Sequence, residues 1–184
     1  VMDPATLPSA DTKMALLELT IARLTEAGYV HIGMDHFALP EDELARAQVD
    51  GSLQRNFQGY TTHGGCDLVG FGMSAIGQVG DCYVQNEKHE IPWIGAIDAG
   101  RLPLQRGLMT DADDRLRREV IGQIMCFGHI DYGQFCAHHG IDFRDYFAAS
   151  LARLAEPERD GLVELRGDGL KITAAGAMLL RIVA

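Results

Sequence analysis

Apolar side chains near the start of the chain predict an amphipathic helix over residues 11–27. They recur at steps of three and four residues, which places them on one helical stripe: Met14, Leu17, Ile21 and Leu24. Asp11 can cap the start of this helix and Gly28 can end it. A short strand, Tyr29–Gly33, follows directly, so the order is that of one half of a β/α repeat. Because no further repeat of this kind follows, we expect these elements to end a larger β/α architecture.

The middle of the chain combines short extended segments with clustered glycines. Pro40 and the acidic residues after it predict a short helix that ends near Asp50. Three extended segments are expected next: Leu53–Thr62, Leu68–Ile76 and Cys82–Asn86. We expect Leu68–Ile76 to be a buried strand, although Gly70 and Gly72 interrupt it. Glycine in a strand gives up side-chain packing, so either a bound ligand or a second stretch of backbone should lie against it.

From Thr110 onward the spacing of apolar residues becomes helical. Thr110 and Asp113 form a variant of the capping box, ahead of an apolar face that runs to Phe127. Two more helices, a hairpin and a last helix are expected: Tyr132–His139, Phe143–Leu154, Gly161–Leu165 with Leu170–Thr173, and Ala174–Val183. Three helices followed by a hairpin is the order of a winged-helix domain. We therefore expect one domain over residues 1–107 and a helical, winged-helix-like domain over residues 108–184.

Composition and charge narrow the class of protein. The chain has 184 residues, 47% of them hydrophobic and 23% charged, which is typical of a folded globular protein. No apolar run approaches the roughly 18 residues of a membrane-spanning helix, and no secretion signal is visible, so we expect a cytoplasmic protein without a membrane partner. The formal net charge is −10, and the third helix of the winged-helix-like part offers only Arg144 and Arg153. Nucleic acid is therefore not an expected partner.

Cysteine and histidine supply one possible metal motif. Cys66 and Cys82 stand far from the others, whereas Cys126-x2-His129-x6-Cys136-x-His138-His139 places two thiols and three imidazoles close together in sequence. Such a group suggests zinc, but the spacing matches no closed zinc site. Free thiols and surface histidines are the favoured interpretation, so we expect no metal ligands in this chain.

Two groups of polar residues are candidates for a ligand site. Asp35 and His36 come just after a strand, where polar residues line the active sites of barrel enzymes. Around Arg55, Gln58 and Tyr60, aromatic side chains alternate with hydrogen-bonding ones, which suits a ligand that is partly planar and partly polar. An ordinary solvated hairpin explains the second group equally well from residue type alone.

Five blocks of sequence occur in a fixed order over nearly the whole chain: IGMDHFALPEDELARAQ, LQRNFQGYTTHGGCDLVGFGMSAIG, GDCYVQN, DGLVE and ITAAG. Together they resemble the C-terminal part of the bacterial oxygen-independent coproporphyrinogen III oxidases of the radical S-adenosylmethionine (SAM) family. The resemblance implies the last elements of an incomplete β/α barrel followed by the helical C-terminal domain. It also implies anaerobic haem synthesis, in which two propionate side chains of coproporphyrinogen III are oxidatively decarboxylated to vinyl groups. The cofactors implied are SAM and a [4Fe-4S] cluster.

The same resemblance implies roles for particular residues. Gln58 and Ile76 fall on positions that contact SAM in the family. Asp35, Arg55 and Tyr60 lie in the matching blocks and are expected to line the active site, without an individual role for each.

The chain departs from the family in one respect that bears on activity. The family holds its cluster with a CxxxCxxC triplet, and no such triplet occurs in these 184 residues. A cluster needs thiolates at suitable spacing, so we expect this chain alone to be inactive and to bind no cluster. The favoured interpretation is a piece of such an enzyme. A short natural gene, a haem-chaperone-like paralogue that binds tetrapyrrole, and a winged-helix interaction module remain alternatives.

Overall fold

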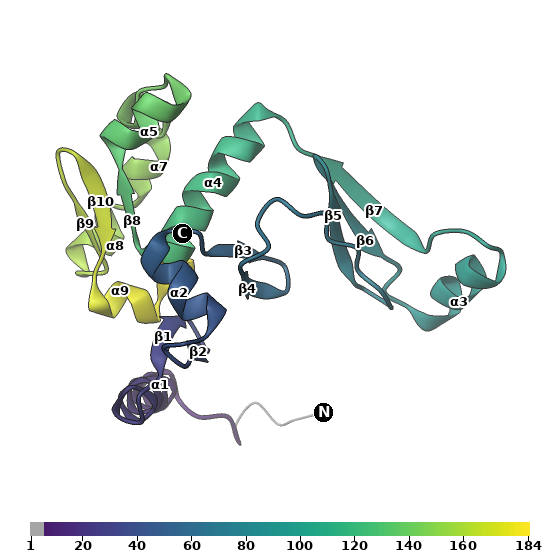
Figure 1. Ribbon diagram of the computed structural model, residues 1–184, viewed down its shortest axis with the longest axis horizontal. Helices are drawn as coiled ribbons and strands as arrows, with labels where there is room; N and C mark the ends of the chain where they lie inside the picture. Colours follow the sequence, from purple (N-terminus) through teal and green to yellow (C-terminus); the bar gives the residue numbers. More distant parts are fainter. Residues whose placement is uncertain (1–5) are drawn as a thin grey trace. The chain divides into compact units, whose positions relative to one another are not determined.

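The computed structural model describes residues 6–184, which form two compact units (Figure 1). Unit 1 contains the chain up to Leu53 together with Gln123–Ala184, and unit 2 consists of Gln54–Gly122. Unit 1 is therefore discontinuous in sequence. The expected division into domains over residues 1–107 and 108–184 stays a prediction.

The N-terminal part of unit 1 pairs two helices with a small hairpin. Its elements are α1 (Ala10–Glu26), β1 (Val30–Gly33), β2 (His36–Ala38) and α2 (Glu43–Asp50). The helix predicted over residues 11–27 is confirmed, and the four residues of its predicted stripe are the less exposed ones around it. The predicted cap was wrong, because the Ser9 side chain accepts the Thr12 N–H while Asp11 lies inside the first turn. β1 pairs antiparallel with β2 through a tight turn.

The C-terminal part of unit 1 packs short helices against a three-stranded antiparallel sheet. Its elements are the end of α4 (Ala112–Phe127), β8 (His129–Asp131), α5 (Tyr132–His139), α6 (Phe143–Tyr146), α7 (Ala148–Arg153), α8 (Ala155–Arg159), β9 (Val163–Leu165), β10 (Gly169–Ile172), α9 (Ala174–Met178) and α10 (Leu180–Val183). The strand order is β8-β10-β9. Phe135, Phe143 and Phe147 form a buried aromatic cluster beside it. The predicted helix Tyr132–His139 and the hairpin are confirmed. The helices predicted over Phe143–Leu154 and Ala174–Val183 are each divided in two, at Phe147 and at Leu179.

Unit 2 is built around a three-stranded antiparallel meander. Its elements are β3 (Gln54–Asn56), β4 (Gly59–Thr61), β5 (Ile76–Val79), β6 (Cys82–Asn86), α3 (Glu90–Asp98), β7 (Leu104–Met109) and the start of α4. β3 and β4 make one hairpin, and the meander has the order β5-β6-β7. The cap predicted at Thr110 and Asp113 lies one residue further on, where the side chains of Asp111 and Asp114 each accept the other's backbone N–H.

The predicted buried strand Leu68–Ile76 was wrong. Residues 68–75 form a loop, which meets the meander through the Leu68–Gln78 bridge and through the Asn86 backbone N–H that donates to the Ala75 carbonyl; Ile76 begins β5. The Phe71 side chain is 91% exposed. Asn86, 7% exposed, holds this loop, because its side-chain amide donates to the carbonyls of Gly70 (3.2 Å) and Gly72 (2.9 Å). A Cβ at Gly70 would lie 2.8 Å from the Ile76 carbonyl oxygen. The chain's own backbone therefore makes the close approach at this glycine.

Two general features bear on the expectations from sequence. The helices within residues 6–184 are all too short or too polar to cross a membrane. Within residues 6–184, the four cysteines form no disulfide bond; Cys126 is buried, while Cys66 and Cys136 are exposed.

Candidate functional site

The β3–β4 hairpin of unit 2 brings together three of the predicted site residues. Arg55 and Tyr60 are cross-strand partners, and the Arg55 guanidinium lies 5.5 Å from the centroid of the Tyr60 ring. Tyr60 is 8% exposed, so its ring anchors the hairpin. Gln58 lies in the two-residue turn, where its backbone N–H donates to the Asn56 side-chain oxygen at 2.8 Å and its side chain is exposed. The hairpin thus presents the Gln58 amide at its tip.

Ile76 begins the strand at one edge of the meander. The register aligns Ile76 with Gln85 and Arg106 across the three strands, and it aligns Gln78 with Tyr83 and Leu108. Because opposed residues point to one side of a sheet and side chains alternate along a strand, these six residues share one face. We call Ile76, Gln78, Tyr83, Gln85, Arg106 and Leu108 the Tyr83 face.

Phe57 connects the hairpin tip to the Tyr83 face. Its ring meets the Tyr83 ring edge-on, with centroids 5.3 Å apart. Gln58 is the next residue along the turn, so two predicted SAM contacts, Gln58 and Ile76, belong to elements joined by this aromatic pair. Arg55 and Tyr60 lie in the same unit.

Two arginines border Tyr83 and Gln85. Arg106 donates from Nε to the Gln85 side-chain oxygen at 2.9 Å. Arg118, on the first turns of α4, donates from Nη1 to the Tyr83 hydroxyl at 3.1 Å, with its guanidinium 5.9 Å from the ring centroid. The Tyr83 face therefore combines aromatic, aliphatic and cationic groups.

Asp35 lies in unit 1, whereas the other four predicted site residues lie in unit 2. It occupies the β1–β2 turn, and its carboxylate accepts a hydrogen bond from His36 Nδ1 at 2.9 Å when that nitrogen carries the proton. Its own backbone N–H lowers the pKa of the Asp35 carboxyl, and the His36 side chain adds to this effect. The structure gives Asp35 a local role in this turn.

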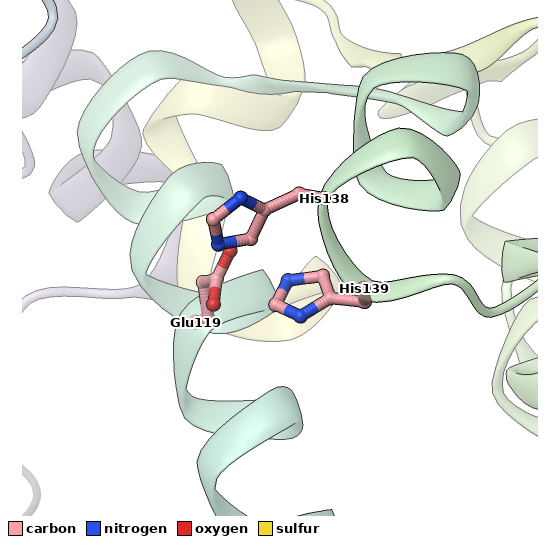
Figure 2. Close-up of side chains that lie close together, drawn as sticks. All are labelled: Glu119, His138 and His139. Carbon is pink, nitrogen blue, oxygen red and sulfur yellow. The ribbon is translucent and has the colours of Figure 1, made fainter.

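The predicted cysteine and histidine motif is divided among different surroundings. Cys126 is 4% exposed, and His129 Nδ1 lies 3.1 Å from the Phe127 carbonyl oxygen. Figure 2 shows His138 and His139 on the last turn of α5, where their rings stand nearly perpendicular with centroids 4.5 Å apart. Glu119, labelled in the same view, comes from the part of α4 that belongs to unit 2. Within residues 6–184, the five residues of the motif do not assemble into a group of potential ligands.

Sequence reasoning did not single out Phe57, Tyr83, Arg106 and Arg118. Phe57 and Tyr83 lay inside recognised blocks, so their aromatic character was a usable signal. The two arginines gave no signal in the sequence. Arg118 is 35 positions from Tyr83, and Arg106 is on a strand that the pattern did not predict.

Comparison with known proteins shows that nearly the whole chain is similar to part of the oxygen-independent coproporphyrinogen III oxidases. Residues 110–179 match the HemN C-terminal domain family. The chain is 50% identical over 175 residues to the oxygen-independent coproporphyrinogen III oxidase of Pseudomonas aeruginosa, which covers 95% of this chain and 38% of that protein. It is 47% identical over 177 residues to the Escherichia coli enzyme of the same name, covering 96% of this chain and 39% of that one.

A solved structure gives the same relation. It is that of coproporphyrinogen III oxidase (HemN) from Escherichia coli, which is described as a radical SAM enzyme. The TM-score is 0.89 and the sequence identity is 46%, and the match covers 99% of this chain and 42% of that one. The resemblance to the C-terminal part of these oxidases is thereby confirmed. The chain spans about two-fifths of the length of the relatives.

Proposed function

From this likeness over nearly the whole chain, we propose that the protein serves as the C-terminal part of an oxygen-independent coproporphyrinogen III oxidase. The observation that carries the proposal is the colinear match in both sequence and structure. In the reaction that the resemblance implies, two propionate side chains of the substrate are oxidatively decarboxylated. The small-molecule substrate is then coproporphyrinogen III.

The residues of unit 2 fit a SAM contact. Gln58 offers an exposed amide that can both donate and accept hydrogen bonds. Ile76 supplies a half-buried aliphatic surface on the Tyr83 face, and the exposed Phe57 ring suits a planar base. Bound SAM supplies the radical chemistry of such enzymes. Gln58 would orient SAM, while Ile76 and Phe57 would keep water from it.

The cysteines do not fit a [4Fe-4S] cluster. Two belong to unit 2 and two to unit 1, and Cys126 is buried. A cluster needs three or four thiolates around one core. We therefore assign the cluster in such an enzyme to residues other than these four cysteines.

The same proposal covers the domain architecture of the chain and its place in the cell. The order helix, β8, helices, β9, β10 and the arrangement β8-β10-β9 support a winged-helix-like domain. α1 and β1 would be the last elements of an incomplete radical SAM barrel. Free thiols favour the cytoplasm, and the acidic balance disfavours a nucleic-acid partner.

A chimera tests the proposed function. The C-terminal part of the Escherichia coli oxidase is replaced by this chain, and anaerobic conversion of coproporphyrinogen III is measured with SAM and a reductant. We expect turnover. A folded chimera that carries an intact cluster but makes no product would overturn the proposal.

A substitution at the hairpin tip tests the SAM contact. Gln58→Ala in the chimera should weaken SAM binding or its cleavage while the cluster spectrum stays unchanged. Gln105→Ala is the control, because it removes another exposed amide, on β7. Unchanged SAM affinity and turnover in Gln58→Ala would remove this residue from the site.

A further inference from the structure

Arg106 and Arg118 are two cations that border the Tyr83 face. Within the part of the chain that the structure describes, residues 6–184, neither forms an ion pair. Their hydrogen-bond partners, Gln85 and Tyr83, are neutral. By contrast, Arg115 and Arg117 on the same helix pair with Asp81 and Asp113. The Tyr83 face itself contains no acidic residue.

The neutral partners hold each guanidinium in place and leave most of its donors available. A guanidinium has five N–H groups in a planar fork. Arg106 uses Nε for Gln85, so both of its terminal nitrogens remain; Arg118 uses Nη1 for Tyr83, so Nη2 and Nε remain. A planar fork of two parallel N–H groups matches a carboxylate bidentately, and such charge-assisted bonds are the strong ones.

The two residues that hold the arginines are spaced along one strand, β6. Tyr83 and Gln85 are two residues apart on β6 and point to the same side, so their anchoring positions are about 7 Å apart. The exposed Phe57 ring lies against Tyr83 and adds an apolar surface beside the cations. A ligand that suits this surface carries an apolar body with at least two carboxylates.

We propose that Arg106 and Arg118 bind carboxylates of the tetrapyrrole substrate, whose apolar body rests on Phe57 and Tyr83. This inference rests on the proposed function, because coproporphyrinogen III is what supplies propionate carboxylates around an apolar macrocycle. Gln85 and Tyr83 act as positioning residues that hold the two guanidinium groups. The hairpin tip with Gln58 would then bring SAM next to the bound substrate.

The experiment measures binding of coproporphyrin III, the stable fluorescent form of the macrocycle, to the full 184-residue chain. Arg106→Gln and Arg118→Gln should each weaken binding about tenfold, as expected for the loss of one charge-assisted contact. Arg153→Gln is the matched control, because it removes the same charge from an exposed position in unit 1. Coproporphyrin tetramethyl ester, which lacks carboxylates, should bind weakly and alike to all variants.

Several outcomes would overturn the inference. One is equal affinity of the chain and both arginine variants for coproporphyrin III, or no binding at all. Another is a loss of SAM affinity with porphyrin affinity unchanged, since SAM also carries a carboxylate. An active chimera with normal porphyrin binding in both variants would remove the arginines and keep the proposed function. A chimera that makes no product but binds coproporphyrin III through the two arginines would overturn the proposed function and keep the arginines as carboxylate ligands.

Discussion

At the scale of single residues, Asn86 holds the glycine-rich loop of unit 2 in place. Its side-chain amide replaces the strand partners that the carbonyls of Gly70 and Gly72 lack, and its backbone N–H donates to the Ala75 carbonyl at 2.9 Å. The loop in turn leads into Ile76. A buried amide therefore fixes the start of the strand that carries a candidate cofactor contact.

Replacing this amide should loosen the loop. Asn86→Ala removes two hydrogen bonds, each worth about 0.5–1.5 kcal/mol, and leaves two carbonyls without their donor. We expect faster chymotrypsin cleavage after Phe71, whose side chain is already exposed. Mass spectrometry of the fragments measures the rate, and Gln105→Ala provides the reference. Equal cleavage rates would show that the loop holds its shape without Asn86.

Tyr132 should make unit 1 sensitive to high pH. Burial raises the pKa of the Tyr132 hydroxyl, and the Arg144 guanidinium 5.8 Å from its ring opposes this shift. The folded state therefore keeps the Tyr132 proton to a higher pH than the unfolded state does. The contribution of Tyr132 to the free energy of unfolding is present below pH about 10 and is lost as the pH rises through the pKa of the folded state. Urea unfolding between pH 8 and 11 should show a smaller loss in Tyr132→Phe than in the unchanged chain. Parallel pH profiles would contradict this.

At the scale of elements, α9 depends on one glycine. A Cβ at Gly176 would collide with the carbonyl oxygen of Leu162, just before β9. Gly176→Ala should force the helix away and cost roughly 1–3 kcal/mol. Gly122→Ala, inside α4 with no neighbour within 4 Å, should instead stabilise by about 0.5–1 kcal/mol. Urea midpoints followed by circular dichroism measure both, and a neutral Gly176→Ala would mean that α9 packs differently.

Elements whose apolar residues recur at a regular spacing were predictable from the sequence, and elements without such a spacing were not. The apolar residues of α1, and those that run from Phe143 through Phe147 to Leu151 over α6 and α7, recur at helical spacing, so the sequence pattern located these elements. α3 was missed because Glu90–Asp98 contains proline and is apolar on all sides, with only Ala96 buried. The segment 68–75 was predicted as a strand because its apolar side chains look buried, whereas Asn86 satisfies its carbonyls from a distant position.

At the scale of the whole molecule, the candidate site depends on contacts between distant segments. The recognised blocks supplied Gln58 and Ile76, but their relation requires the Phe57–Tyr83 contact, which joins the hairpin to the meander. Arg118 reaches Tyr83 from α4, across 35 positions. Such contacts follow from the tertiary fold of unit 2 and leave no local pattern in a single sequence.

The distribution of cysteines over the whole chain predicts how it responds to iron and sulfide. Cys66 and Cys82 belong to unit 2, Cys126 and Cys136 to unit 1, and Cys126 is 4% exposed. Because a [4Fe-4S] cluster needs three or four thiolates at one place, anaerobic reconstitution of the 184-residue chain should leave far less than one cluster per chain. Iron analysis and the charge-transfer absorption band measure this. The chimera, whose Escherichia coli part would supply the CxxxCxxC triplet that the family resemblance implies, should take up a cluster under the same conditions. Stoichiometric iron and sulfide in the chain alone would show that its own cysteines assemble a cluster after all.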